Sequence, residues 1–328
     1  MTAQPDAATL LRSKNYLGVL AISALLGAPI SAAAYGFLAL VSYLQSELFT
    51  HLPHALGYAS APAWWPAPAL VVGASLTAVV ITTLPGSGGP SPAAGFKLHG
   101  PPTPAQLPGV IAAALATLCF GMVLGPEMPL ILIGGGLAAL VISVAKKDAP
   151  EQATKVIASA GSFAAISTLL GSPILGAFLL MEASGLSGMM LGVVLLPGLL
   201  AAGIGSLIFV GLNSLTGLGT FSLAIPGLPH FGRPNIGEFG WAIVIGLAAA
   251  LIGAGLHRMA PRAHRYAEKR TLLVLPAGGL AVAGLVIAFT EATGKPARAV
   301  LFSGQSSLGP LVDHAASYSA SALILRVA

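Results

Sequence analysis

Charged side chains are scarce in this sequence. Lys, Arg, Asp and Glu make up only 8% of the 328 residues, against about 25% in an average soluble domain. Hydrophobic residues make up 55%, and the mean hydropathy is +0.88. Because so little charge cannot cover the surface of a water-soluble domain, the composition excludes the soluble classes and predicts an integral membrane protein that contacts the lipid bilayer.

Cysteine is almost absent. Cys119 is the only one, so neither a disulfide framework nor a cysteine metal site can form. His51 and His54 are three residues apart but have no third partner nearby, so no metal and no cofactor is expected. The net charge of +5 comes without a basic patch interleaved with aromatics, which argues against nucleic acid as a partner.

The alternating ten-residue pattern of an outer-membrane barrel is also missing, so the spans are predicted to be helical. Apolar windows of about 20 residues, the length that crosses a bilayer, recur from Tyr16 to the end, with room for roughly eight to ten. The 41 glycines and 25 prolines favour close helix packing, broken helices and re-entrant segments. The expected fold is an all-α integral membrane bundle.

Basic residues predict the orientation of this bundle. Residues 1–15 are expected to form a cytoplasmic N-terminal segment before a retained first span, residues 16–43, because no signal-peptide cleavage site follows. The second span is expected at residues 66–84. The linker between the first and second spans has no Lys or Arg and is expected outside. Five basic residues are expected in a second cytoplasmic loop after the span 236–256: Arg258, Arg262, Arg265, Lys269 and Arg270. The pattern favours a multi-pass protein of the cell (plasma) membrane.

Turn residues interrupt the apolar stretch "LPGSGGPSPAAGF", residues 84–96. Its glycines free the backbone to turn sharply, and Pro90 and Pro92 suit the first turn of a short helix, where no N–H is needed. We therefore expect Ser87 to lie at a helix N-terminus within the membrane.

A second interruption, "GMVLGPEMPL" (121–130), places a single acid at another helix start. Gly125 breaks the preceding run, and Glu127 with Pro129 opens a helix that continues uncharged to Ala145. A helix N-terminus offers unpaired N–H groups and about half a positive charge, and so attracts anions. Two such starts that converge at mid-depth would bind an anion through neutral groups, weakly enough for release.

Glu127 is the only Asp, Glu, Lys or Arg between Lys97 and Lys146. A lone charge at the bilayer centre costs roughly 2.5 to 3.5 kcal/mol, so some group must compensate for it. Its carboxylate could occupy the anion site itself, and protonation would neutralise it and admit an external anion. The alternative is an acid that only caps its own helix.

Three motifs, in this order and spacing, resemble those of the CLC chloride channels and proton-coupled chloride antiporters. They are "GSGGP" (86–90), "GPEMP" (125–129) and "GSPILGAFLLMEASG" (171–185). The resemblance implies a CLC-type inverted repeat of tilted and broken helices in a homodimer with one pore per subunit. It also implies that Ser87 coordinates the central chloride and that Glu127 is the external gate. The expected anion-binding positions are Gly86, Ser87, Gly88, Gly89, Pro90, Gly125, Glu127 and Met128.

The sequence departs from the family pattern at two informative positions. Pro126 replaces the usual basic residue before the gate, which removes one N–H and one positive charge. Proton-coupled members carry two adjacent acids after the third motif, where this chain has Glu182 and Ala183. Alanine cannot carry a proton, so the resemblance implies conduction that is not strictly proton-coupled. The alternative is an antiporter in which another relay, such as Glu182, substitutes.

The family also carries a third anion-binding helix start and a pore tyrosine near the end of its membrane domain. Neither is found here, and the context of Tyr318 does not match the pore tyrosine. We therefore expect an anion-transport domain, residues 16–328, that is incomplete at its C-terminal end. Residues 16–213 would form the first repeat and residues 236–328 a partial second repeat.

Two further functions remain open from the sequence. A carrier for another small anion, such as fluoride or nitrate, would use the same hydroxyl and backbone groups. An intramembrane serine protease is the alternative from another class, because "GLSG" (185–188) has a Gly-x-Ser-Gly form and a Ser187/His257 dyad is conceivable. Four residues match easily by chance in a chain with 41 glycines, so the protein is not expected to be an enzyme.

Overall fold

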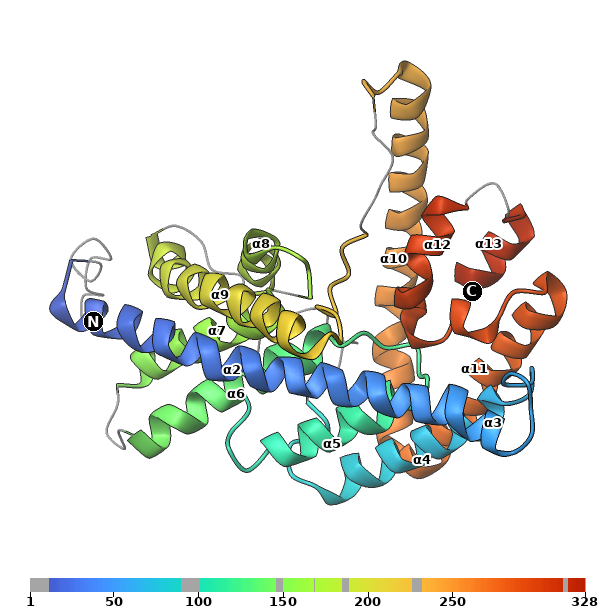
Figure 1. The fold of residues 1–328 in the computed structure, drawn as a ribbon, viewed down its shortest axis with the longest axis horizontal. Coiled ribbons are helices and arrows are strands. Elements are labelled where there is room, and N and C mark those ends of the chain that lie inside the picture. The colour runs from blue at the N-terminus through green and yellow to red at the C-terminus, as the bar shows by residue number, and fades with distance from the viewer. Residues whose placement is uncertain are drawn as a thin grey trace.

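The computed structural model describes residues 12–89, 101–145, 150–167, 169–184, 189–225, 232–314 and 318–327. Within these residues all regular structure is helical, which confirms the predicted fold class. The helices, labelled as in Figure 1, are α2 (Lys14–Ser46), α3 (Leu52–Ala55), α4 (Pro66–Thr83), α5 (Leu107–Leu118), α6 (Glu127–Ala145), α7 (Glu151–Ile166), α8 (Pro173–Ser184), α9 (Met189–Thr216), α10 (Ile236–Lys269), α11 (Thr271–Thr293), α12 (Leu308–Asp313) and α13 (Ala320–Val327). Short π-helical and 3-10 segments cover Glu47–His51, Ala297–Ala299 and Phe302–Ser307.

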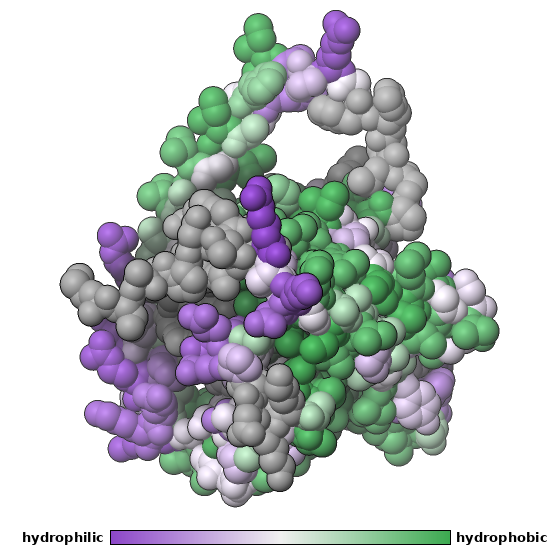
Figure 2. Space-filling model, turned by 90° about the vertical axis from the view of Figure 1, so that its left-hand side faces the viewer, coloured by the Kyte–Doolittle hydropathy of each residue, from purple (hydrophilic) through white to green (hydrophobic). Residues whose placement is uncertain are grey.

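Six helical segments in the described residues are long and apolar enough to cross a membrane. They are α2 with its continuation to Ala55, α4, α6, α9 from Leu191, α10 and α11. The predicted first two spans correspond to α2 and α4. The sequence predicts roughly eight to ten spans. The numbers differ because several apolar windows fold as shorter helices, such as the 12-residue α5 and α8. Figure 2 shows the large hydrophobic areas that these helices leave on the outer surface.

Local capping explains where the long helices begin and end. The Ser13 hydroxyl accepts the Tyr16 N–H at 3.2 Å and starts α2. Asn235 and Glu238 form a capping box at the start of α10, with reciprocal hydrogen bonds of 2.9 and 2.8 Å. Gly294, with φ +63°, ends α11 in the left-handed conformation that glycine adopts at little cost.

The central layer consists of α2, α6, α7 and α9, which lie side by side in Figure 1. Small residues let α6 and α7 approach closely, because a Cβ built on Gly134 or on Gly161 would collide with the carbonyl oxygen of the other. Buried hydroxyls also bridge neighbouring helices. Ser31 donates to the Ala164 carbonyl at 3.1 Å, and Ser162 donates to the Ile131 carbonyl at 2.8 Å. Such bonds stabilise membrane bundles by about 0.6 kcal/mol each.

A second contact joins α4 to α11, far apart in the sequence. A Cβ on Gly279 would come within 2.8 Å of the Leu70 carbonyl oxygen and 3.0 Å of the Ala74 Cβ. Leu70, Ala283 and Val286 are buried there with Phe49 and Leu301. The pair therefore ties the C-terminal part of the chain to the second span.

The long helix α10 stands out from the rest of the molecule (Figure 1) and has no buried residue. The prediction of a basic loop after residue 256 is wrong, because α10 continues through Arg258, Arg262 and Arg265 to Lys269. The segment has Ala, Arg, Lys and Glu, which favour helices, and Pro261 removes only one hydrogen-bond donor from the helix interior.

The contact between α6 and α7 predicts the effect of a single methyl group. Gly161→Ala should lower the melting temperature of the detergent-purified protein, because overpacking at a backbone contact costs about 1 to 3 kcal/mol. Gly203→Ala in α9 is the matched control, since nothing lies within 4 Å of a Cβ there, and it should leave the transition unchanged or raise it slightly. Fluorescence-detected gel filtration after heating measures both transitions. Equal transition temperatures for the two variants would contradict the close packing of α6 on α7.

Candidate functional site

The loop between α4 and α5, which contains Ser87 and is called the serine loop below, has an unusual backbone. Four consecutive residues have positive φ: Gly86 (94°), Ser87 (48°), Gly88 (74°) and Gly89 (99°). Ser87 is the one non-glycine residue among them and is exposed. A non-glycine residue in this region is uncommon and carries strain, and such strain clusters at functional sites.

This loop is held against the start of α5 and the second turn of α6. A Cβ on Gly86 would come within 2.8 Å of the Gln106 Cβ, and one on Gly109 would collide with the Pro85 carbonyl oxygen. On the other side, a Cβ on Gly89 would come within 2.7 Å of Leu132 Cδ1 in α6. The helix start that the structure brings to the serine loop is thus that of α5, which the sequence did not single out. The helix start predicted at Pro90 lies outside the described residues.

The predicted helix start at Glu127 is confirmed as the first residue of α6. The flanking Pro126 and Pro129 are buried and carry no N–H. The Leu130 N–H donates to the Pro126 carbonyl at 2.9 Å and closes the first turn. Helix geometry leaves the Met128 amide without a partner inside the helix, while the Met128 side chain packs against the apolar cluster around Ile131. Only the backbone of Met128 is therefore placed to meet a ligand.

The side chain of Glu127 folds back over Gly125. A Cβ built on Gly125 would overlap the Glu127 carboxylate, with Cδ at 2.6 Å and Oε1 at 2.8 Å. Glu127 is partly buried, and Gly125 supplies the space that its carboxylate occupies. The sequence indicated Gly125 as a helix breaker, but this contact depends on a side-chain position that no sequence pattern contains.

The serine loop and Glu127 share α6 as their support. The loop touches Leu132, five residues beyond Glu127 and about 7.5 Å further along the helix axis. Five residues also turn the helix by about 140°, so the loop contacts a different side of α6 from that on which Glu127 projects. One helix therefore positions both sites that the sequence predicted.

The third motif forms the start of α8. Gly171, with φ +69°, precedes Pro173, and a Cβ on Gly171 would come within 2.9 Å of Ser222 Oγ. Glu182 lies in the last turn of α8, and its side chain falls outside what the structure describes. Ser187 also lies outside the described residues, and His257 is an exposed residue of α10. The structure therefore does not test the protease dyad.

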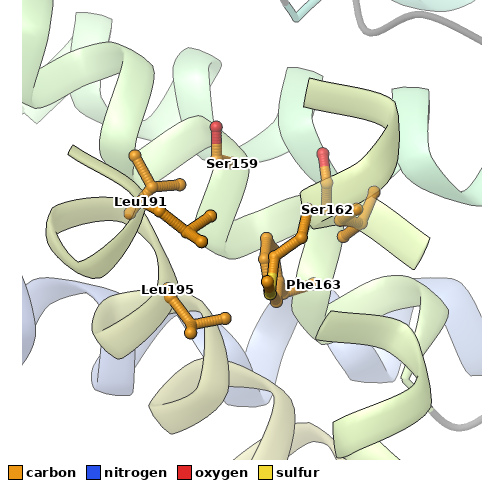
Figure 3. A pocket seen from close by; sticks show the side chains of 8 residues that line it. Ser159, Ser162, Phe163, Leu191 and Leu195 are labelled. Atoms are coloured by element: carbon orange, nitrogen blue, oxygen red, sulfur yellow. The ribbon is translucent and has the colours of Figure 1, made fainter. Parts of the chain in front are cut away.

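A small hollow lies between α7, α8 and α9 (Figure 3). It measures about 20 Å³ and is lined mainly by apolar residues such as Phe163, Leu191 and Leu195, which leaves room for about one water molecule. The hydroxyls of Ser159 and Ser162 at its edge donate to the carbonyls of Lys155 and Ile131. In the part of the chain that the structure describes, no three His, Cys, Asp or Glu residues are placed to hold a metal.

Tyr318 lies near the end of the chain, away from both motif sites in sequence. The Lys295 ammonium sits over its ring, 4.1 Å from the centroid. This cation–π contact stabilises the packing of the segment that follows α12.

The fold matches that of a solved structure, a slow cyanobacterial Cl⁻/H⁺ antiporter. The TM-score is 0.65 at 16% identity, over 94% of this chain and 78% of the antiporter chain. This likeness shows that the described residues follow the CLC fold.

Sequence relatives include ion-transport proteins called YfeO. The protein of Salmonella paratyphi A is 29% identical over 266 residues, which is 80% of this chain and 62% of the relative. That of Shigella boydii is 28% identical over 294 residues, 88% of this chain and 66% of the relative. The chain thus spans about two thirds of the length of these relatives or slightly less. Residues 68–327 match the family model described as voltage gated chloride channel, and because this match covers most of the sequence, the chain belongs to that family, the CLC family of membrane ion channels and transporters.

Proposed function

We propose that this protein carries chloride or a similar small monovalent anion across the cell membrane, that Glu127 gates the pathway, and that transport is not strictly proton-coupled. The observation that carries the proposal is the carboxylate of Glu127, folded back over Gly125 at the start of α6. A carboxylate at a helix start occupies the kind of place that an anion would take.

Neutral groups support transport rather than tight binding. Between Lys97 and Lys146 the chain has no Lys or Arg, so α5 and α6 offer an anion helix ends and backbone amides, next to the Ser87 hydroxyl, without a full positive charge of their own. These donors hold an anion without a full opposite charge. Binding of this kind is weak enough to permit release, which conduction requires.

The proposal that coupling is loose comes from Ala183. It occupies the position of the family's internal proton acceptor, and its methyl group cannot bind a proton. Glu182, the adjacent residue, lies in the last turn of α8 and is the substitute relay if the protein is an antiporter. The antiporter is the second candidate function.

We also propose that residues 16–213 and 236–328 form two repeats, the second partial, and that the protein is a homodimer. The order of elements supports the repeats. A helix of 33 residues (α2), one of 18 (α4) and a left-handed serine loop precede α5. A helix of 34 residues (α10), one of 23 (α11) and a second left-handed stretch, Phe302–Gly304, precede α12.

Anion flux with simultaneous measurement of internal pH tests the proposed function. The protein is reconstituted into chloride-loaded liposomes, and chloride efflux is followed with an electrode while an internal dye reports pH. We expect efflux without proton movement against a gradient, because the proton position is Ala183. Efflux that drives protons uphill would select the antiporter, and no efflux above empty liposomes would reject both candidates.

The contact between Glu127 and Gly125 predicts that two different substitutions open the same gate. Glu127→Gln is uncharged at every pH, so chloride efflux at neutral pH should rise and its acid activation should disappear. Gly125→Ala should have a similar effect at neutral pH, because the added Cβ takes the space of the Glu127 carboxylate.

The double variant Gly125→Ala/Glu127→Gln provides the control. If both changes act through one carboxylate position, the double variant should conduct no faster than either single variant, since residues that act together are not additive. Gly203→Ala, where nothing lies within 4 Å of a Cβ, should behave as wild type. Normal acid activation in Glu127→Gln would show that another group is the gate.

Two substitutions at Ser87 distinguish the effect of its left-handed backbone on stability from the effect of its hydroxyl on anion binding. Ser87→Gly should stabilise the fold, because relief of a left-handed non-glycine residue is worth about 1 kcal/mol, yet it should weaken chloride binding about tenfold or more through loss of a hydroxyl donor. Ser87→Ala should lose affinity equally without the gain in stability. Isothermal titration and thermal unfolding measure both quantities, and unchanged affinity in both variants would remove Ser87 from the site.

A further inference from the structure

The C-terminal end of α10 carries a stripe of positive charge. Arg258, Arg262, Arg265 and Lys269 follow one another at intervals of four, three and four residues, which places all four on one face of the helix. All four are exposed, whereas Ala260, His264 and Ala267 on the opposite face are partly covered. The stripe therefore points away from the rest of the molecule.

In the part of the chain that the structure describes, no carboxylate neutralises the charges of this stripe. The ion pair found in this part of α10 joins His264 to Glu268, with Nε2 and Oε1 3.2 Å apart. No carboxylate lies within 4.0 Å of the four stripe cations among the described residues. The Arg262 guanidinium donates instead to the Arg258 carbonyl at 2.9 Å, one turn back. Four cations on one face are thus available to an external anionic surface.

The neighbouring helices place this stripe at the bilayer surface. The uncharged part of α10 before it, Phe239–Leu256, has 18 residues, about 27 Å of helix and close to the hydrocarbon thickness of about 30 Å. The apolar part of α11 begins at Leu272, directly after it. Because one span ends and the next begins here, the stripe lies on one side of the membrane, between the two apolar segments.

Geometry limits how far the cations can lie from the lipid. Along the chain, Arg258 and Arg262 lie within about 9 Å of Leu256, and Arg265 and Lys269 lie within about 9 Å of Thr271. This distance is comparable to the Debye length of about 8 Å at physiological ionic strength. The charges are therefore close enough to anionic headgroups to attract them.

We propose that the stripe Arg258, Arg262, Arg265 and Lys269 binds anionic phospholipid headgroups of the cytoplasmic leaflet. Arginine holds phosphate with two parallel N–H bonds, and three of the four residues are arginines. The bound lipid would neutralise the charge that the protein leaves unpaired. This inference does not depend on the proposed gate at Glu127.

Spin-labelled lipids test the proposal on the full chain. The protein is placed in nanodiscs of phosphatidylcholine with a minority of phosphatidylglycerol, and electron paramagnetic resonance measures the immobilised fraction of labelled phosphatidylglycerol and labelled phosphatidylcholine. One cation at the surface should raise the relative occupancy of the anionic lipid about fivefold. The variant with Gln at all four positions should lose this preference, and a preference equal to that of wild type would overturn the proposal.

A second variant separates the stripe from net charge. Arg262→Gln and Arg265→Gln combined with Met259→Arg and Ala263→Arg keep four cations but spread them around the exposed side of the helix. We expect a clearly smaller preference for phosphatidylglycerol. Retention of the full preference would show that net charge alone attracts the lipid, and the assignment of the stripe would fall.

Wild-type protein gives an answer even if the variants do not fold. Its preference for phosphatidylglycerol over phosphatidylcholine should disappear as the salt concentration rises from about 0.01 M to about 1 M, because the Debye length falls from about 30 to about 3 Å. Displacement of the lipid by inorganic phosphate beyond the effect of chloride at equal ionic strength would point to a site for free phosphate. Displacement by a short oligonucleotide at low concentration would point to nucleic acid, and either result would overturn the proposal.

Discussion

Glu127 is the first residue of α6, one of the helices long and apolar enough to cross a membrane, and a carboxylate at membrane depth would need a compensating group. An isolated charge at the bilayer centre costs roughly 2.5 to 3.5 kcal/mol. The start of α6 offers the positive end of a helix dipole, and Gly125 offers the space into which the Glu127 side chain folds. Because Pro126 and Pro129 carry no N–H, the helix end alone has fewer donors than usual, and the position of the carboxylate depends more strongly on the surrounding backbone.

The position of that helix start is fixed by close contacts further along α6. Gly134 meets Gly161 of α7, Ser162 bonds to the Ile131 carbonyl, and Leu132 touches the serine loop through Gly89. These contacts all lie within the first two turns after Glu127, so they define its depth and direction. Glycine matters at these contacts, since a larger residue at Gly89, Gly134 or Gly161 would displace α6 and Glu127 with it.

The sequence predicted those parts of the site that local chemistry determines. The pattern Gly-Pro-Glu-x-Pro was sufficient to place a helix start at Glu127, because each residue has a strong positional preference there. The left-handed backbone at Ser87 could not be predicted, since serine has no preference for it and only the packing of Gly86 and Gly89 imposes it. The position of the Glu127 carboxylate over Gly125 could not be predicted for a similar reason, because it depends on a side-chain rotamer selected by tertiary contacts.

The basic segment after residue 256 shows the opposite error. Its charges favour a loop by composition, although their spacing of four, three and four residues is that of one helical face. The charges predict a side of the membrane, whereas their periodicity indicates the helix that the structure shows.

The distribution of positive charge also bears on the gate. The stripe on α10 is the densest group of cations in the sequence, whereas no Lys or Arg lies between Lys97 and Lys146. Were the four stripe cations uncovered, they would attract the same small anions that the neutral site is proposed to carry, and would compete with it at low salt. Headgroups bound along the stripe would remove this competition, because each neutralises one cation at a fixed place. On the two proposals together, lipid neutralises the charges that orient the chain, and the anion meets only helix ends, a hydroxyl and one protonatable carboxylate.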